Sequence, residues 1–389
     1  MTVVISVVSF LIVFSLMVFV HEFGHFIVAK KAGVRVREFG FGFPFAAHKP
    51  PSERPLTWMI GKDKEGTVYS INLIPFGGFV NLGENDPDDP RSLANFPKST
   101  RLASLVAGPT MNLLLAFVIF ALAALIGYPE FLYGVGIVEV HEGSPAQEGG
   151  LQSDDVMLSV GELALNGFTT DFEEAGAMVS RVVEYVAARA GQPVLVLVQR
   201  GLGPEAERIE FTVTPRADQI GEGKMGIGIR SVPVRLKRLR ASFLGSLSYS
   251  LDKVLNTLLL TGLIPLRVLQ GRLPADAART VGPVGIALMT GNAVRQSLDV
   301  NWAYPILDLM GVLNVAIAVI NLLPLPALDG GHIFFVLLEA VRGKPISPEK
   351  EGLVHGVGLA LLLLFLVVIT VQDIFIPMPQ GINLADYFY

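Results

Sequence analysis

The 389-residue chain contains no cysteine, so disulfide bonds and thiolate metal sites are both excluded. Charged residues make up only 17% of the sequence against 51% hydrophobic residues, and none of them falls within residues 1–20. This is too little charge for an ordinary soluble protein of this size. A net charge of −5 without a basic block does not indicate nucleic-acid binding. The composition predicts a membrane protein with some soluble mass, in which any metal is bound by His, Asp or Glu.

Four apolar runs predict a polytopic α-helical protein with four transmembrane helices, the first two in 1–34 and 101–129, the third, broken, in 301–342 and the last in 343–389. Lys30, Lys31, Arg35 and Arg37 follow the first run directly, which indicates the cytoplasmic side. The N-terminus, the C-terminus and the segment between the second and third spans are then extracytoplasmic. The lack of a basic n-region and of a small-residue cleavage site predicts that the first run is a retained span and not a signal peptide.

The first span contains the sequence His21-Glu22-Phe23-Gly24-His25. Residues four apart lie on one face of a helix, so His21 and His25 can bind one Zn²⁺ while Glu22 reaches a water molecule at the metal. Two histidines with ordinary hydrogen bonds would be the alternative in a soluble helix. Ionisable side chains are costly within a membrane, and three of them in five positions favour the metal site. The motif predicts a zinc hydrolase whose chemistry lies ~8–14 Å from the cytoplasmic end of the span.

The third span should break near its end, because Pro324 and Pro326 cannot both sit inside a continuous helix. Irregular backbone at membrane depth survives only where protein or water surrounds it, so the break should line a cavity. Asp329 follows the break and would complete a His₂-carboxylate site of the hydrolytic type. A purely structural aspartate is the alternative. His332 competes as a ligand, although its spacing from Asp329 suits a packing or supporting role better.

Residues 35–100 are rich in β-formers, glycine and proline, which predicts a membrane-associated β-rich segment. It is either a hairpin packed on the membrane face or an edge that pairs with an extended substrate through Gly77 and Gly78. Asn112, in the second span, forms a packing hydrogen bond or faces the catalytic cavity. His355, near the cytoplasmic start of the last span, needs no role beyond reaching water.

Residues 130–220 predict a small α+β domain, with strands at 134–140, 156–160, 194–199 and 209–215 and a helix at 172–188. Its order of short motifs, from Ser144-Pro145-Ala146 through Asp154-Asp155-Val156, resembles a PDZ domain, which binds extended peptide ends by β-addition. A spacer or plug is the alternative. Residues 221–300 are expected to be a linker with an interfacial amphipathic helix near 254–269.

Taken together, these features resemble the site-2 protease family of intramembrane zinc metalloproteases, in particular its bacterial four-span branch of the regulator of sigma-E protease type. The resemblance covers nearly the whole chain and is carried by the motifs at 21–25, 75–78, 107–112, 282–286 and 321–330. There are two departures: a single PDZ domain replaces the tandem pair, and Asn81 stands where many relatives carry lysine.

The resemblance implies a zinc metalloendopeptidase with Zn²⁺ bound by His21, His25 and Asp329 and with Glu22 as the general base. The substrates would be single-span membrane proteins already cut by another protease, such as anti-sigma factors or remnant signal peptides. Asn321, at the break, is expected to bind the unwound substrate backbone. A PDZ-bearing adaptor with structural zinc and a divalent-metal transporter are the rival functions. Replacing Glu22 by Gln distinguishes protease from adaptor, and the absence of an internal repeat weighs against the transporter.

Overall fold

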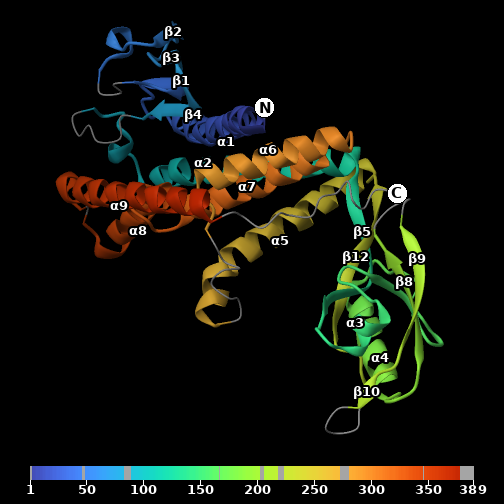
Figure 1. Cartoon of the computed structure of the whole chain (residues 1–389). Helices are drawn as coiled ribbons and strands as arrows, with labels where there is room; N and C mark the ends of the chain where they lie inside the picture. The colour runs from blue at the N-terminus through green and yellow to red at the C-terminus, as the bar shows by residue number, and fades with distance from the viewer. Residues whose placement is uncertain are drawn as a thin grey trace. The chain divides into compact units, whose positions relative to one another are not determined.

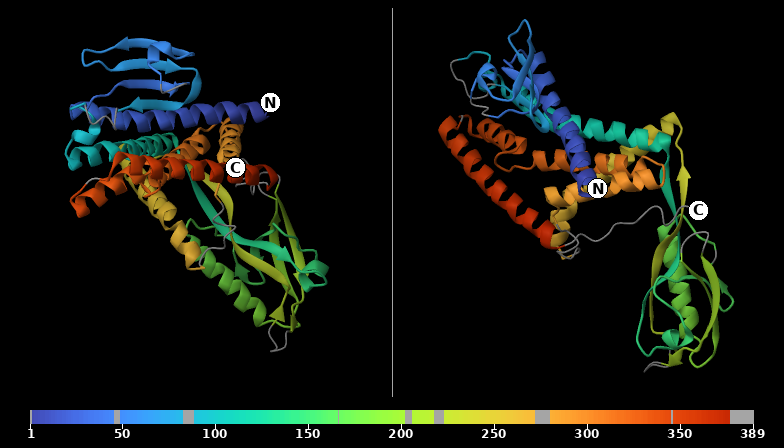
Figure 2. Two further views of the ribbon diagram at one scale, coloured as in Figure 1. Left: turned by 90° about the vertical axis from the view of Figure 1, so that its left-hand side faces the viewer. Right: turned by 45° about the horizontal axis from the view of Figure 1, so that its top comes forward.

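The computed structural model describes residues 2–45, 49–82, 89–165, 167–201, 206–217, 223–271, 280–344 and 346–376. Within these ranges the chain forms two compact units. One comprises residues 2–126 and 241–376, and the other comprises residues 127–240. Each unit has its own sheet, and Figures 1 and 2 show the order of their elements.

Four helices of the first unit are long and apolar enough to cross a membrane, as predicted. They are α1 (Thr2–Lys31), α2 (Lys98–Ile126), α7 (Tyr304–Leu322) and α9 (Pro348–Phe375). Their side chains are largely exposed: only 6% of the most apolar window of α9 is buried within the protein. Large apolar side chains that face outward along a whole helix require lipid as their solvent.

The helix packing around α2 is close because small residues lie at the contacts. A Cβ on Gly24 of α1 would lie 2.4 Å from the carbonyl oxygen of Ala107 in α2, so the two backbones touch there. On α7, Gly311 receives the ring of Phe120. Helix α6 (Pro283–Asp299) packs on α1 and α7, with Gly291 against Ser6. Membrane helices associate mainly through such close van der Waals packing.

The third span breaks where the two prolines predicted it. Helix α7 ends at Leu322, and α8 (Asp329–Arg342) begins after six residues of irregular backbone. Ala327 in this loop has φ +70°, a left-handed conformation that costs a non-glycine residue about 1–2 kcal/mol. A Cβ at Gly330 would lie 2.0 Å from the carbonyl oxygen of Leu323, so the loop folds back tightly onto the start of α8.

The β-rich segment after α1 is a four-stranded sheet in the order β2-β3-β1-β4. Its strands are β1 (Glu38–Phe43), β2 (Thr57–Lys62), β3 (Val68–Asn72) and β4 (Ile74–Asn81), and short 3₁₀ helices lie at Pro51–Glu53 and Leu93–Asn95. β1 runs parallel to β3 and antiparallel to β4. The buried carboxylate of Glu38 accepts hydrogen bonds from Arg54 at 2.6 Å and from Ser70 at 2.7 Å. β4 packs on α1 and brings the sheet to the first span (Figure 2).

The second unit is an α+β domain built on the sheet β12-β5-β6-β8-β9, with β7 paired to β6. Its apolar core contains Val135, Met157, Val182 and Val196, all at most 1% exposed. Its elements are β5 (Tyr128–Val140), α3 (Pro145–Gly149), β6 (Val156–Val160), β7 (Leu163–Ala164), α4 (Phe172–Ala187), β8 (Val194–Arg200), β9 (Glu207–Val213), β10 (Arg216–Ala217), β11 (Gly223–Lys224) and β12 (Ile227–Leu239).

Two features differ from the predicted boundaries. The α+β domain does not end at residue 220, because β12 pairs with β5 from Ile227 to Leu239 and so belongs to the domain instead of the predicted linker. The predicted helix at 254–269 is present but begins earlier, as α5 (Phe243–Leu269). It packs on α2 and α7, with Lys253 Nζ 3.0 Å from Asp308 Oδ1. It is not among the four candidate spans, and its interfacial position remains a prediction.

Candidate metal centre

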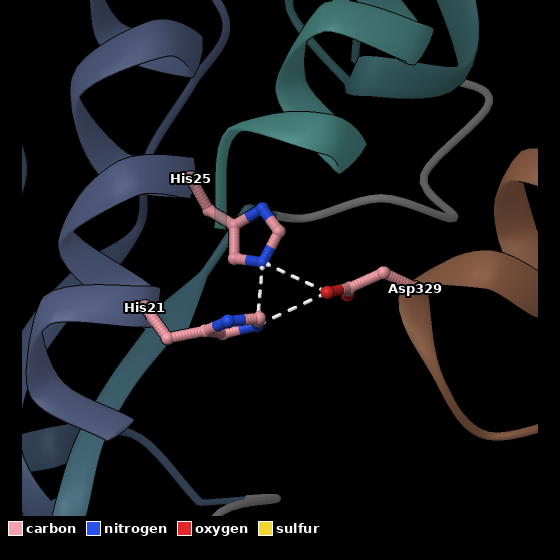
Figure 3. Close-up of side chains that lie close together, drawn as sticks. All are labelled: His21, His25 and Asp329. Atoms are coloured by element: carbon pink, nitrogen blue, oxygen red, sulfur yellow. Dashed lines mark hydrogen bonds and ion pairs between the residues drawn. The ribbon is translucent and has the colours of Figure 1, made fainter. Parts of the chain in front are cut away.

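Two imidazoles project from successive turns of α1 toward the same point (Figure 3). His21 and His25 are 7% and 5% exposed, and their Nε2 atoms lie 3.1 Å apart. Their four-residue spacing on a helix produces this convergence. Both rings are therefore held at one buried point within the first span.

Asp329 reaches the same point from the first residue of α8 (Figure 3). Its Oδ2 lies 3.0 Å from Nε2 of His21 and 3.4 Å from Nε2 of His25. Because Asp329 begins a helix, the helix dipole stabilises its carboxylate. The broken third span thus brings a negative charge to two histidines that precede it by some three hundred residues.

Ser104 of α2 fixes the tautomer of His25. The His25 Nδ1–H donates a hydrogen bond of 2.7 Å to the backbone carbonyl oxygen of Ser104. With its hydrogen on Nδ1, the neutral ring keeps the lone pair of Nε2 directed toward His21 and Asp329. Metal-binding histidines characteristically donate their second N–H to such an acceptor.

Asn112 contacts the other imidazole, that of His21. Its fully buried side-chain amide lies 3.2 Å from His21 Nδ1. With Oδ1 facing the ring, the amide accepts the Nδ1 hydrogen and leaves Nε2 free to bind a metal. With Nδ2 facing the ring, Oδ1 has no hydrogen-bond partner among the described residues. The first orientation is the one compatible with a metal at Nε2, and in either orientation Asn112 contacts a candidate ligand directly.

Gly108 provides the space that both imidazoles occupy. A Cβ on Gly108 would lie 2.3 Å from His25 Nε2 and 2.8 Å from His21 Cε1. No larger residue fits without displacing a ring. Ser104, Gly108 and Asn112 are spaced by four residues, so one face of α2 supplies the polar contacts to both rings and the space for them. The parts played by Ser104 and Gly108 were not predicted, although a stripe of small and polar residues in an apolar span was a usable signal.

The three candidate ligands fit zinc. Tetrahedral coordination with metal–ligand bonds of about 2.0–2.1 Å places the ligand atoms about 3.3–3.4 Å from one another. The separations of 3.0, 3.1 and 3.4 Å are close to these values. Asp329 Oδ2 is also buried without a hydrogen-bond donor among the described residues, as expected of an atom that binds a cation. Three protein ligands would leave the fourth position of a bound zinc open to water or substrate, as in hydrolytic zinc sites.

The other predicted site residues lie in two places. Glu22 is half-buried on α1, and strand β4 approaches it at Gly78. A Cβ on Gly78 would lie 3.1 Å from Glu22 Cβ, while Gly77, with φ +69°, contacts Val18. Asn321 is half-buried in the last turn of α7, just before the break.

His332 does not join the candidate ligands. It lies in a second cluster with Glu351 and His355 of α9, in which its ring stacks on that of His355 with the centroids 3.9 Å apart. The expectation that His355 only reaches water was wrong, because its side chain is just 13% exposed. Sequence spacing gave no indication of this contact between two helices.

The sequence model of peptidase family M50 matches residues 9–365, a range that includes all three candidate ligands. The chain belongs to peptidase family M50. This M50 peptidase is 29% identical to the zinc metalloprotease RasP of Oceanobacillus iheyensis, over 95% of the chain and 98% of the relative.

Two further relatives are each 33% identical to the M50 peptidase. One is a putative zinc metalloprotease of Clostridium perfringens, with 94% of the chain and 98% of the relative covered. The other is a probable chloroplastic membrane metalloprotease, ARASP2, of Arabidopsis thaliana, with 93% and 79% covered. With its four candidate spans, this M50 peptidase is a multi-pass membrane zinc metalloprotease.

Proposed function

We propose that this M50 peptidase hydrolyses peptide bonds within the transmembrane segment of single-span membrane proteins that another protease has already shortened. The observation that carries the proposal is the meeting of two candidate spans at one metal-binding point: His21 and His25 belong to α1, and Asp329 follows the break after α7. Charged and ionisable side chains are otherwise avoided within the bilayer. Two imidazoles and a carboxylate that meet there are therefore suited to a substrate that enters from the bilayer.

His21, His25 and Asp329 are the proposed zinc ligands, and Glu22 is the proposed general base. When bound, zinc activates water and polarises the peptide carbonyl. Glu22 follows His21 directly on α1, takes the proton of the attacking water and passes it to the leaving amine. Ser104 and Asn112 contact Nδ1 of the two imidazoles and so hold both rings in orientation.

The substrate must be unwound before it can be cut, because the carbonyl groups of a helix are already hydrogen-bonded within it. β4 suits this task. It is an edge strand of the described sheet, with β1 as its neighbour on one side, and Gly78 brings its backbone against Glu22. An extended substrate that adds to this edge gains sequence-tolerant main-chain hydrogen bonds. Gly77 and Gly78 would shape the strand, and Asn321 would hold the unwound backbone from the opposite span.

The second unit is proposed to be a single PDZ domain that binds a peptide end. A cavity of about 450 Å³ lies between α4 and the start of β12, and its lining is mostly apolar with Lys224 and His141 included. An apolar groove beside an edge strand, with a cationic side chain, suits a peptide ending in an apolar residue and a free carboxylate. Val183 lines it and is 53% exposed.

The groove is tested on the full chain with a fluorescent peptide ending in valine and with its C-terminally amidated twin. Val183→Glu should weaken binding of the free-carboxylate peptide at least tenfold, because a charge enters the apolar groove. Leu195→Glu is the control, since Leu195 is 47% exposed on β8 and is not part of the cavity lining. The peptide-end site is refuted if Val183→Glu binds the free-carboxylate peptide as tightly as Leu195→Glu does, and if the native chain binds the amidated peptide as tightly as the free-carboxylate one.

We infer the orientation of the chain across the membrane from the charges at the ends of the helices. Lys30 and Lys31 end α1, and Lys98 and Arg101 begin α2. Basic residues favour the cytoplasmic side, so the four-stranded sheet would be cytoplasmic and the PDZ unit extracytoplasmic, in the cell (inner) membrane of a bacterium. The anti-sigma factors and remnant signal peptides expected as substrates span such a membrane once.

Quantitative mass spectrometry of membrane proteins tests the substrate class. Cells in which Glu22→Gln replaces the normal chain should accumulate short single-span fragments whose extracytoplasmic part has already been removed. Asn321→Ala should produce a weaker accumulation of the same fragments, because it affects substrate binding and not the chemistry. The proposal fails if only intact proteins, soluble proteins or no proteins accumulate.

A further inference from the structure

The loop that carries Asp329 is tied to the fourth span by one side chain. His355 of α9 accepts at Nδ1 a hydrogen bond of 2.9 Å from the backbone N–H of Ala327. Ala327 precedes Asp329 by two residues and has φ +70°. A residue held in this sparsely populated conformation needs support from its surroundings. The hydrogen bond from α9 supplies it.

The His355 ring is held firmly in this position. It stacks on His332 with an interplanar angle of 12° and lies 5.4 Å from the ring of Phe335, both on α8. A Cβ on Gly331 would lie 3.1 Å from His355 Cε1, so the start of α8 leaves just enough room for the ring. One turn later on α9, a Cβ on Gly358 would lie 2.1 Å from Pro326 Cβ. The fourth span therefore contacts the loop at two adjacent points.

His332, Glu351 and His355 do not form a second metal site, although their polar atoms lie close together. Nδ1 of His355 accepts a hydrogen bond, so the hydrogen of the neutral ring is on Nε2, which has no lone pair to offer. The lone pairs of imidazole lie in the ring plane. Two nearly parallel rings stacked 3.9 Å apart therefore cannot both direct one at a single ion.

We propose that His355 is a positioning residue for the proposed zinc ligand Asp329. By accepting the Ala327 N–H, it holds the loop in the conformation that starts α8 with Oδ2 at 3.0 and 3.4 Å from the two histidines. Without that acceptor, the left-handed conformation of Ala327 loses its support and Asp329 loses its fixed direction. The fourth span thereby controls metal binding without supplying a ligand. The inference rests on the metal site of the proposed function.

The test uses the purified full chain in detergent and two variants of matched shape. His355→Asn keeps an acceptor oxygen at the place of Nδ1, whereas His355→Leu has the same branching and no acceptor. We expect His355→Leu to weaken zinc affinity about 10–100-fold, the range found when groups that orient metal ligands are lost. It should also diminish the visible absorption of Co²⁺ bound at the same site. His355→Asn should have a zinc affinity and a Co²⁺ absorption within about threefold of those of the native chain, because the acceptor that orients the loop is kept.

The outcomes separate positioning from simple packing. If both variants lose zinc equally, or if His355→Leu binds zinc like the native chain, the inference is overturned. Should His355→Leu fail to fold, His355→Gln replaces it, because its amide reaches the place of Nε2 instead of Nδ1 and should bind zinc as weakly. Metal binding is measured without any substrate. A chain that follows this zinc pattern yet cleaves no membrane protein would refute the proposed function and leave the role of His355 intact.

Discussion

Replacing Glu22 by Gln should leave the zinc content unchanged and lower the rate of peptide cleavage by about 10²–10⁴-fold, the usual contribution of a general base. Glutamine has nearly the same shape as glutamate but cannot take up the proton of the attacking water. Glu22 is not among the three side chains that converge on the candidate metal point, so metal binding should survive. Cleavage of a single-span fragment reconstituted in vesicles, with zinc measured by mass spectrometry on the same sample, tests both parts.

Glu162→Gln is the matched control, because Glu162 is exposed in the second unit and should have no effect on either measurement. If the Glu22→Gln chain loses zinc as well as activity, Glu22 is a ligand or a structural residue. If cleavage continues at the native rate, the proposed base is wrong. Unchanged biological output with zinc retained would instead favour an adaptor whose zinc is structural.

Replacing Asp329 by Asn should lower zinc affinity by more than about 100-fold, because loss of a ligand exceeds the 10–100-fold effect of losing a supporting group. The amide keeps the size of the carboxylate but removes the negative charge that faces His21 and His25 at 3.0 and 3.4 Å. Cleavage should fall to background. Competition with a chromophoric chelator gives the affinity, and the cleavage assay is repeated across zinc concentrations.

Asp299→Asn makes the same chemical change at an exposed residue at the end of α6 and should leave zinc affinity as it is. A chelator should abolish cleavage by the native chain, and added zinc should restore it. The metal site is refuted if the Asp329→Asn chain binds zinc as tightly as the native chain.

The four spans and the break in the third span could be predicted from local features of the sequence, namely apolar runs and prolines. The uncharged run before His21 could only be a membrane helix, and α1 extends from Thr2 to Lys31. Pro324 and Pro326 cannot continue a helix, and α7 ends at Leu322. The histidine pair was predictable for the same reason, since a spacing of four residues on a helix determines which face both side chains share.

The end of the α+β domain could not be predicted from local features in the same way. Residues 227–239 carry many charges and one proline, so they lack the clean alternation of a half-buried strand. Their strand conformation depends on pairing with β5, which lies almost a hundred residues earlier in the chain. The start of α5 at Phe243 was missed because Ser242, its N-cap, precedes a stretch too polar to read as part of an apolar helix.

Local covalent and periodic constraints were enough to predict the class of protein, the four spans, the two imidazoles on one helix face and the carboxylate after a helix break. Three contacts became visible only in the folded chain: Asp329 meets both rings, Ser104 and Asn112 contact their Nδ1 atoms, and His355 accepts a hydrogen bond from the Ala327 loop. These contacts join helices far apart in the chain. Their distances depend on how small residues such as Gly24 and Gly108 let the helices approach, which no local pattern specifies.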